Sequence, residues 1–241
     1  MIHYSLNAEA LAHKNEIGNK AVNLAKVAEL IGEDIIANGF VIATESFQNC
    51  RLEVIANEIY VECLKRNISF PIILRSSANV EDSMYSFAGI FDSYICESDN
   101  DIYKGLENVL LAKKSERLQV YCNRAHIDSN SVQLSIIVQT VVKADYAGVA
   151  FSKNPVTNDD SIIYIEYIMS DTSGVEGGLG NPIAISISKK KERLAIPEAK
   201  MIDIIKKYIL KLEKVFGKEI DVEWAYSKGV LKIFQVRPIT T

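Results

Sequence analysis

Several features that mark particular classes of protein are scarce in this sequence. Four cysteines occur among 241 residues, they are widely spaced, and there is no CxxC pair. This pattern matches neither a zinc site nor the disulfide framework of a small secreted protein. The first fourteen residues, MIHYSLNAEALAHK, also lack the charged start and the apolar stretch of a signal peptide. We therefore expect reduced thiols and a cytoplasmic location.

Long apolar runs and an excess of basic charge are missing as well. The longest apolar stretches, such as LSIIVQTVV, are too short to cross a bilayer as a helix. The 27 Lys and Arg residues are outnumbered by 31 Asp and Glu, which gives a formal net charge of −4 and no overall basic field for a nucleic-acid backbone. Neither a membrane nor a nucleic acid is therefore expected as a partner.

The residues that are present suit a globular protein of mixed structure. The composition is 48% hydrophobic and 24% charged, which is ordinary for a folded domain. Strand-like and helix-like segments are interleaved, but they lack the regular strand–helix alternation of a doubly wound parallel sheet. This irregular order predicts an α+β fold, with two lobes and mostly antiparallel sheet. The expected helices cover residues 18–32, 51–66, 101–125 and 198–216, and the expected strands cover residues 39–42, 71–77, 90–97, 132–142, 147–152, 161–168 and 183–188, followed by a C-terminal hairpin.

The segment LRSSANVEDSMYSFAG contains the first candidate site residue. Arg75 ends a short apolar strand, where burying a guanidinium is costly unless it meets an anion. Serines around it add hydroxyl donors, and Gly89 would allow a ligand to approach the backbone closely. The alternative is a serine-rich turn in which Glu81 or Asp82 pairs with Arg75. This segment by itself leaves both interpretations open.

Lys20 is the second candidate. It lies in the first turn of the helix expected at residues 18–32, where the helix dipole disfavours a cation by roughly 0.3–1 kcal/mol. The backbone N–H groups of such a turn favour an anion, and a neighbouring lysine can complete a phosphate site. A misplaced surface lysine is the simpler alternative.

The third candidate is the C-terminal hairpin, DVEWAYSKGVLKIFQVRPITT. A three-residue turn at residues 227–229, with Gly229 in the left-handed conformation, would put Glu223 and Gln235 on one face of adjacent strands. Arg237 lies two residues beyond Gln235, about 7 Å along the strand. Oxygen ligands for Mg²⁺ beside an arginine suit a nucleotide triphosphate. The alternative is a solvated face with no ligand.

The same register also predicts apolar contacts on that face. Leu231 and Ile233 would then lie beside Glu223, where they would suit the edge of a purine.

Six sequence elements occur in a fixed order: GNKAVNL, GFVI, ILRSSANVEDSMYSFAGIFDS, VQTVVKADYAGVAFSKNP, GLGNP and DVEWA…GVLKIFQVRPIT. Together they resemble the ATP-binding domain of the phosphoenolpyruvate synthase and pyruvate phosphate dikinase family, and they span nearly the whole chain. The resemblance implies a two-lobed variant of the ATP-grasp fold, forming a single domain over residues 1–241. It places an N-terminal lobe with a phosphate-binding loop at residues 1–125, and a C-terminal lobe with adenine- and metal-binding strands at residues 126–241.

The resemblance implies roles for residues in the first part of the chain. Lys20, in the family's G-x-K-A element, and Arg75, in its R-S-S element, would contact ATP phosphates. Gly89 and Ser93 match residues of the loop that folds over the triphosphate. Gln139 matches a residue that lines the adenine pocket.

It also implies roles for residues of the hairpin. Glu223, Gln235 and Arg237 match the family's D-x-E-W and Q-x-R-P elements, with the same spacing. Glu223 and Gln235 would hold Mg²⁺, and Arg237 would contact the phosphates. ATP and Mg²⁺ are therefore the expected cofactors, with Lys20, Arg75 and Arg237 as the catalytic cations.

The implied activity is ATP-dependent phosphoryl transfer to a histidine on a separate carrier domain, either in trans or in a longer chain. None of the three histidines, His3, His13 and His126, lies in the family's glycine-rich carrier motif. We expect all three to be incidental, and the chain to be incomplete without a carrier. One alternative is a catalytically incomplete module that binds nucleotide and senses it or scaffolds a partner. Another is direct ATP-dependent ligation of a carboxylate to an amine.

Overall fold

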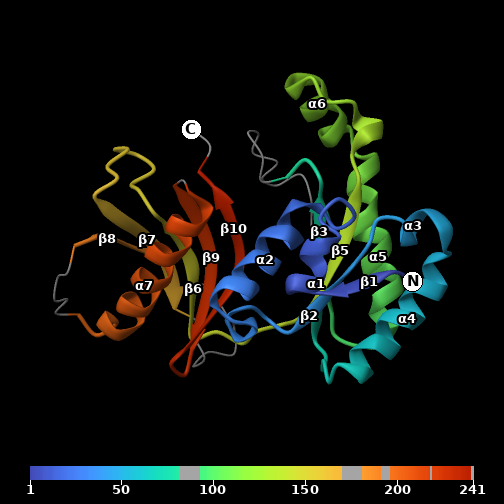
Figure 1. Ribbon diagram of the computed structural model, residues 1–241. Coiled ribbons are helices and arrows are strands. Elements are labelled where there is room, and N and C mark those ends of the chain that lie inside the picture. The colour runs from blue at the N-terminus through green and yellow to red at the C-terminus, as the bar shows by residue number, and fades with distance from the viewer. Residues whose placement is uncertain (82–92, 170–180, 191–195, 218, 240–241) are drawn as a thin grey trace. The chain divides into compact units, whose positions relative to one another are not determined.

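The protein divides into two compact units in a computed structural model that describes residues 1–81, 93–169, 181–190, 196–217 and 219–239. The units are Met1–Val141 and Val142–Ile239, and each contains one five-stranded antiparallel sheet (Figure 1). The predicted α+β class is therefore confirmed. The boundary falls later than the expected residue 125, because the strand at residues 134–140 pairs with two strands of the first unit.

The sheet of the first unit has the strand order β1-β2-β5-β3-β4. Its strands are β1 (His3–Ser5), β2 (Gly39–Ile42), β3 (Ile72–Ala78), β4 (Ser93–Cys96) and β5 (Leu134–Thr140). Its helices are α1 (Ala8–Ala12), α2 (Gly18–Ile31), α3 (Ser46–Asn49), α4 (Leu52–Lys65), α5 (Ile102–Leu111) and α6 (Glu116–Ala125). The short elements β1 and α1 had no counterpart in the sequence-based prediction.

The two faces of this sheet differ because side chains alternate along each strand. Ile72, Leu74 and Val138 point to one side and join the hydrophobic core that α4 and α5 complete. Arg75 and Gln139 have the opposite parity and share the side on which α2 packs. We call this second side the α2 face. A buried strand pair therefore presents a guanidinium and an amide on one surface.

The start of α2 is fixed tightly to the end of β3. Gly18 has a φ of 69°, and a Cβ atom at this position would lie 2.2 Å from the carbonyl oxygen of Ser77. The backbone N–H of Ala21 donates a hydrogen bond of 3.0 Å to Oγ of Ser77. Asn19 donates from its side chain to the backbone oxygen of Glu81, at 2.7 Å. These contacts hold the first turn of α2 in a defined position.

The sheet of the second unit has the strand order β10-β9-β6-β7-β8. Its strands are β6 (Tyr146–Phe151), β7 (Ile162–Met169), β8 (Ile183–Ser188), β9 (Ile220–Ser227) and β10 (Val230–Pro238), and its helix is α7 (Ala199–Phe216). Gly217 ends α7 in the left-handed conformation, with φ 66°, as the sequence predicted. Among the described residues, no helix is long and apolar enough to cross a membrane.

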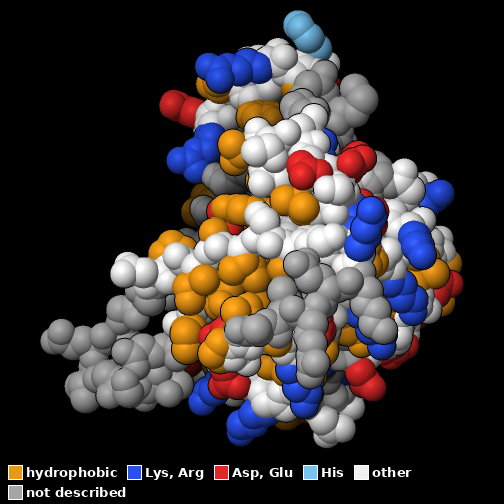
Figure 2. All heavy atoms as spheres, turned by 90° about the vertical axis from the view of Figure 1, so that its left-hand side faces the viewer, with side chains coloured by type: hydrophobic (Ala, Val, Ile, Leu, Met, Phe, Trp, Pro, Cys, Tyr) orange, Lys and Arg blue, Asp and Glu red, His pale blue; other side chains and the backbone are white. Residues whose placement is uncertain are grey.

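Helix α7 covers one face of the second sheet. The apolar side of α7 packs mainly against β6, β9 and β10, where side chains such as Trp224 and Ile233 are buried. Met169 and Ile183, towards the β7–β8 edge, remain partly exposed. Figure 2 shows apolar side chains on this side of the molecule. The opposite face of the sheet carries Glu223 and its neighbours, and we call it the Glu223 face.

The C-terminal hairpin reaches the expected pairing by a different route. Its turn has two residues, Lys228 and Gly229, both with positive φ (50° and 86°), instead of the expected three. Such a turn matches the twist of the flanking strands. An irregularity at Phe234 then adds one residue to β10, so that Glu223 lies directly opposite Gln235. The predicted neighbours are therefore correct, but a bulge creates the register.

The bulge also corrects the expected position of two apolar residues. Leu231 pairs with Tyr226 and Ile233 pairs with Trp224, on the N-terminal side of the bulge in β10. Both are therefore buried on the face that α7 covers, at 5% and 0% exposure. They do not lie beside Glu223.

Candidate functional site

Lys20 is a buried cation with defined partners. Its side chain is 8% exposed, and its Nζ donates to the backbone oxygen of Ser76 at 3.0 Å. Nζ also lies 3.3 Å from Oε1 of Glu81, whose other carboxylate oxygen accepts from the N–H of Ala78 at 2.8 Å. The buried carboxylate compensates the charge that the helix dipole disfavours at this position. Glu81, one of the two acids that the sequence offers as a partner of Arg75, thus forms an ion pair with Lys20.

Arg75, Ser93 and Gln139 lie together on the α2 face of the first sheet. Arg75 is directly opposite Ser93 on β4, and it lies diagonally across from Gln139 on β5. Arg75 is 8% exposed and Ser93 is exposed. Lys20 reaches the same region, because Ser76, which accepts its hydrogen bond, is the residue after Arg75. Four of the predicted residues are therefore neighbours within one unit.

Gln139 offers an acceptor atom in this region. Its side chain is 1% exposed, and its Nε2 donates to the backbone oxygen of Ala37 at 3.1 Å. Within the described residues its Oε1 has no hydrogen-bond partner. An unpaired amide oxygen is costly to bury, and it suits a donor such as an exocyclic amine. Gly89, the remaining candidate of this part of the chain, lies outside the described residues.

Glu223, Gln235 and Arg237 lie together on the Glu223 face of the second unit. Glu223 and Gln235 are direct neighbours across β9 and β10, and Arg237 follows two residues later along β10. Arg237 lies opposite Asp221, and its Nε is 2.8 and 2.7 Å from the two carboxylate oxygens of Asp221. Burial raises the pKa of Asp221, and the Arg237 guanidinium offsets part of this effect. The candidate arginine is therefore oriented by a buried acid.

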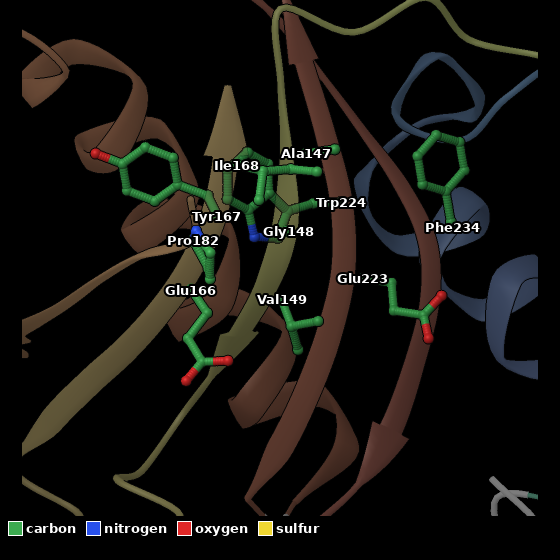
Figure 3. Close-up of a pocket in the computed structure, with 10 residues that line it drawn as sticks. All are labelled: Ala147, Gly148, Val149, Glu166, Tyr167, Ile168, Pro182, Glu223, Trp224 and Phe234. Carbon is green, nitrogen blue, oxygen red and sulfur yellow. The ribbon is translucent and has the colours of Figure 1, made fainter. Parts of the chain in front are cut away.

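A pocket of about 420 Å³ opens beside Glu223 within the second unit. Val149 on β6 lies between Glu166 on β7 and Glu223 on β9, as the strand register requires and Figure 3 shows. The other lining residues are Ala147, Gly148, Tyr167, Ile168, Pro182, Trp224 and Phe234. The pocket thus combines an apolar surface with two carboxylates, one of which belongs to the predicted metal pair.

The donor set at Glu223 suits Mg²⁺ that is shared with a ligand. One carboxylate and one amide oxygen come from directly paired residues, Glu223 and Gln235. Within the described residues no group of three or more His, Cys, Asp or Glu side chains is placed to hold a metal by itself. Mg²⁺ commonly takes one or two protein oxygens and completes its shell with water and substrate phosphates. The pair therefore fits a magnesium nucleotide better than a free metal ion.

Sequence reasoning missed some residues near the candidate site. Asp221, the partner of Arg237, had a visible signal, because it lies two residues before Glu223 and so shares its face of β9. Glu166 had a weaker one, as the single charged residue in the strand SIIYIEYI. The apolar lining from Ala147 and Val149 had none, since contact with the pocket depends on how β6 pairs with β7 and β9.

Comparison with known proteins identifies the family of this chain. Residues 50–194, more than half of the chain, match the family described as "Pyruvate phosphate dikinase, AMP/ATP-binding domain". The probable phosphoenolpyruvate synthase of Methanocaldococcus jannaschii is 29% identical, over 70% of this chain and 17% of that protein. The rifampicin phosphotransferase of Bacillus subtilis is 26% identical, over 70% of this chain and 23% of that protein. The chain thus spans about a fifth of the length of these relatives.

A solved structure supports the fold alone. The ADP complex of N5-carboxyaminoimidazole ribonucleotide synthetase aligns with 93% of this chain and 45% of its own, with 13% identity and a TM-score of 0.50. This likeness agrees with the α+β ATP-grasp architecture of two units, each built on an antiparallel sheet. The family match confirms the resemblance predicted from the six sequence elements. The chain belongs to the pyruvate phosphate dikinase family of AMP/ATP-binding domains.

Proposed function

We propose that this chain binds Mg·ATP and serves as the nucleotide-binding part of a phosphotransferase whose acceptor is a histidine on a separate carrier domain. The observation that carries the proposal is the direct pairing of Glu223 with Gln235, beside Arg237, at the edge of a pocket. In a chain of this family, an oxygen pair and a guanidinium on one surface are suited to a metal-bound phosphate tail.

Residues of the first unit would contribute to nucleotide binding. Lys20 and Arg75 would contact phosphate oxygens, together with Gly89 and with Ser93, the first residue of β4. The unpaired Oε1 of Gln139 would accept a hydrogen bond from the adenine amino group. This assignment rests on the shared α2 face of Lys20, Arg75, Ser93 and Gln139 and on the sequence elements in which these residues lie.

In the second unit, Glu223 and Gln235 would hold Mg²⁺, and Arg237 would bind phosphate oxygens. Bound Mg²⁺ would supply positive charge to the phosphates and help to orient them. Arg237 is held by Asp221 through both carboxylate oxygens, so little freedom of the side chain would be lost when a phosphate binds. A preorganised guanidinium is more effective for a charged transition state than a mobile one.

The proposed reaction forms a P–N bond between the β-phosphorus of ATP and an imidazole nitrogen of the carrier, while the P–O bond to the leaving AMP breaks. The terminal phosphoryl group of the resulting pyrophosphorylated histidine then passes to water or inorganic phosphate, which leaves phosphohistidine on the carrier. Phosphoryl transfer depends mainly on in-line positioning and on neutralising the charge that develops on the oxygens. Lys20, Arg75 and Arg237 would supply that charge from the protein. The proton of the attacking imidazole leaves with the solvent or a base of the carrier domain.

The three histidines of this chain support a carrier elsewhere. His13 stacks on Tyr4 with ring centroids 4.0 Å apart, and its Nδ1 lies 3.0 Å from Glu16. His126 ends α6 in the left-handed conformation, and His3 packs edge-on against Phe40. Each therefore has a local structural role, and none lines the pocket beside Glu223. All four cysteines are free thiols, which supports a reducing, cytoplasmic setting.

Calorimetric titration with ATP, in Mg²⁺ and in EDTA, tests the binding step. The wild-type chain should bind ATP more tightly with Mg²⁺. Glu223→Gln should remove most of that gain while leaving binding in EDTA nearly unchanged, because it removes the charged metal ligand only. Glu29→Gln, on the exposed side of α2, is the matched control and should behave as wild type. Equal Mg²⁺ dependence in Glu223→Gln and wild type would refute the metal assignment.

Transfer is tested by supplying a histidine carrier domain of this family together with Mg·ATP carrying labelled phosphates. Label on a histidine of the carrier, with stoichiometric release of AMP, would support the proposed reaction. Tight binding of Mg·ATP with no label under any condition would favour a nucleotide-binding module without chemistry. Label transfer by a variant that lacks Lys20, Arg75 and Arg237 at the wild-type rate would refute their catalytic roles.

A further inference from the structure

Gly39 is a strand glycine whose missing side chain leaves room for that of Gln139. The two residues are direct partners across β2 and β5. A Cβ atom on residue 39 would lie 2.6 Å from Cγ of Gln139 and 2.2 Å from the backbone oxygen of Val138, and both distances are too short for a non-bonded contact. A glycine inside a strand often marks such a close approach. The side chain of Gln139 therefore occupies space that any larger residue at position 39 would need.

The neighbours of Gln139 also fix where its amide lies. On the other side of β5, the direct partner of Gln139 is Ile73 of β3, so a bulky side chain stands there where β2 has Gly39. The side chain of Gln139 reaches towards the β2 side, where its Nε2 donates to the backbone oxygen of Ala37 at 3.1 Å. Gln139 and Ala37 are each 1% exposed, so this hydrogen bond is buried. The amide of Gln139 is thus held by packing and by one backbone contact.

This contact determines which atom of the amide remains available. A carbonyl oxygen only accepts hydrogen bonds, so the NH₂ group of Gln139 must face Ala37, and Oε1 is left as an acceptor. Oε1 is buried, and no residue in the described part of the chain donates to it. A buried acceptor discriminates between ligands, because a donor satisfies it whereas a second acceptor leaves both atoms unpaired.

We propose that Gly39 is a positioning residue for recognition of the nucleotide base, and that it acts through the amide of Gln139. In this orientation Gln139 accepts a hydrogen bond from the 6-amino group of adenine and disfavours a 6-oxo purine, which has an oxygen at that position. The inference rests on the proposed binding of ATP and adds the residue that sets the preference for the base. It concerns the base alone, so the proposed contacts with Mg²⁺ and phosphate do not depend on it.

Calorimetric titration with Mg·ATP and Mg·ITP measures the base preference as a ratio of two affinities. The wild-type chain should bind ATP about 10- to 100-fold more tightly than ITP. Gly39→Ala should lose most of this preference, because the added methyl group displaces the amide of Gln139. Gly105→Ala is the matched control, since a Cβ there would lie 2.8 Å from Cδ1 of Tyr94 and 2.9 Å from Cδ1 of Leu74, away from Gln139. It should lower the melting temperature but keep the wild-type ratio.

Gln139→Met removes the amide and leaves Gly39 in place, so it tests the inference even if Gly39→Ala does not fold. It should lose the preference for ATP, and adding Gly39→Ala to it should not change the ratio further. A wild-type ratio in Gln139→Met or in folded Gly39→Ala would overturn the inference, as would an equal loss of preference in Gly105→Ala. Equal affinity of the wild-type chain for ATP and ITP would also overturn it, while the proposed function would stand. Failure of the wild-type chain to bind either nucleotide would overturn both.

Discussion

The buried pair of Lys20 and Glu81 allows the structural and functional roles of Lys20 to be measured separately. Both side chains are 8% exposed, and the Nζ–Oε1 distance is 3.3 Å. Removing one partner of a buried ion pair typically costs about 3–5 kcal/mol, because the other charge stays buried without compensation. Glu81 keeps its hydrogen bond from the Ala78 N–H at 2.8 Å, so we expect Lys20→Met to lower the free energy of unfolding by about 3 kcal/mol, the lower end of that range.

Neutralising the remaining charge should reverse part of this loss. The double variant Lys20→Met/Glu81→Gln should be about 1–2 kcal/mol more stable than Lys20→Met, since no uncompensated carboxylate is left in the interior. Urea titration of the wild type, both single variants and the double variant gives the coupling energy. Lys14→Met is the control, because Lys14 is exposed. Its stability should differ from that of the wild type by less than about 0.5 kcal/mol.

Binding of Mg·ATP should not recover along with stability. The double variant still lacks the ammonium, so its affinity for Mg·ATP should remain as weak as that of Lys20→Met. A coupling energy below about 0.5 kcal/mol would refute the pairing of the two residues. Wild-type affinity in the stable double variant would instead refute the proposed contact of Lys20 with phosphate.

Gly18→Ala should destabilise the protein more than Gly217→Ala, although both glycines have a positive φ, because only the Cβ at residue 18 would meet a carbonyl oxygen of β3, at 2.2 Å. Equal losses in urea titrations would contradict this. Tyr4→Phe removes the hydrogen bond that holds the pKa of Glu16 below its usual range. A carboxyl group whose pKa is lowered in the folded state stabilises the protein at pH values above its unfolded-state pKa. This stabilisation is lost as the pH falls through the folded-state pKa. The decrease in the free energy of unfolding caused by Tyr4→Phe should therefore be largest near neutral pH and become smaller in acid. Thermal melts over a pH series would show a constant difference if this were wrong. Burial raises the pKa of Cys96 to about 12, so its thiol should stay unreactive towards a disulfide reagent at pH 8 until the protein unfolds, and rapid labelling of the native protein would count against the buried position.

Much of the secondary structure could be predicted because its signals are local. The apolar stripe and the flanking glycines predicted α2, and Gly217 marked the end of α7. Alternation predicted β9 and β10, and six ordered elements predicted the family. The elements β1 and α1 escaped because they have three and five residues, too few to show a period.

Strand pairing determined where the boundary between the units falls. It also determined which residues of the hairpin lie on the Glu223 face. The sequence of β5 reads as a strand in either unit, and only its hydrogen bonds with β2 and β3 assign it to the first. The turn and the bulge at Phe234 together set the register of the hairpin. A shift of one residue exchanges the two faces of a strand, which is why Glu223 faces Gln235 as expected while Leu231 and Ile233 are buried under α7.

The charged residues show the same division. Residue type and motif predicted Lys20, Arg75, Glu223, Gln235 and Arg237 as candidate site residues. A cation in the first turn of a helix, or an acid on an alternating strand, can be recognised from the sequence. Tertiary structure alone decided which acid compensates which cation. Glu81 lies 61 positions from Lys20, and no local rule could have identified Lys20 as its partner. Such a pairing is a property of the folded chain, because the free energy of a charge depends on everything that surrounds it.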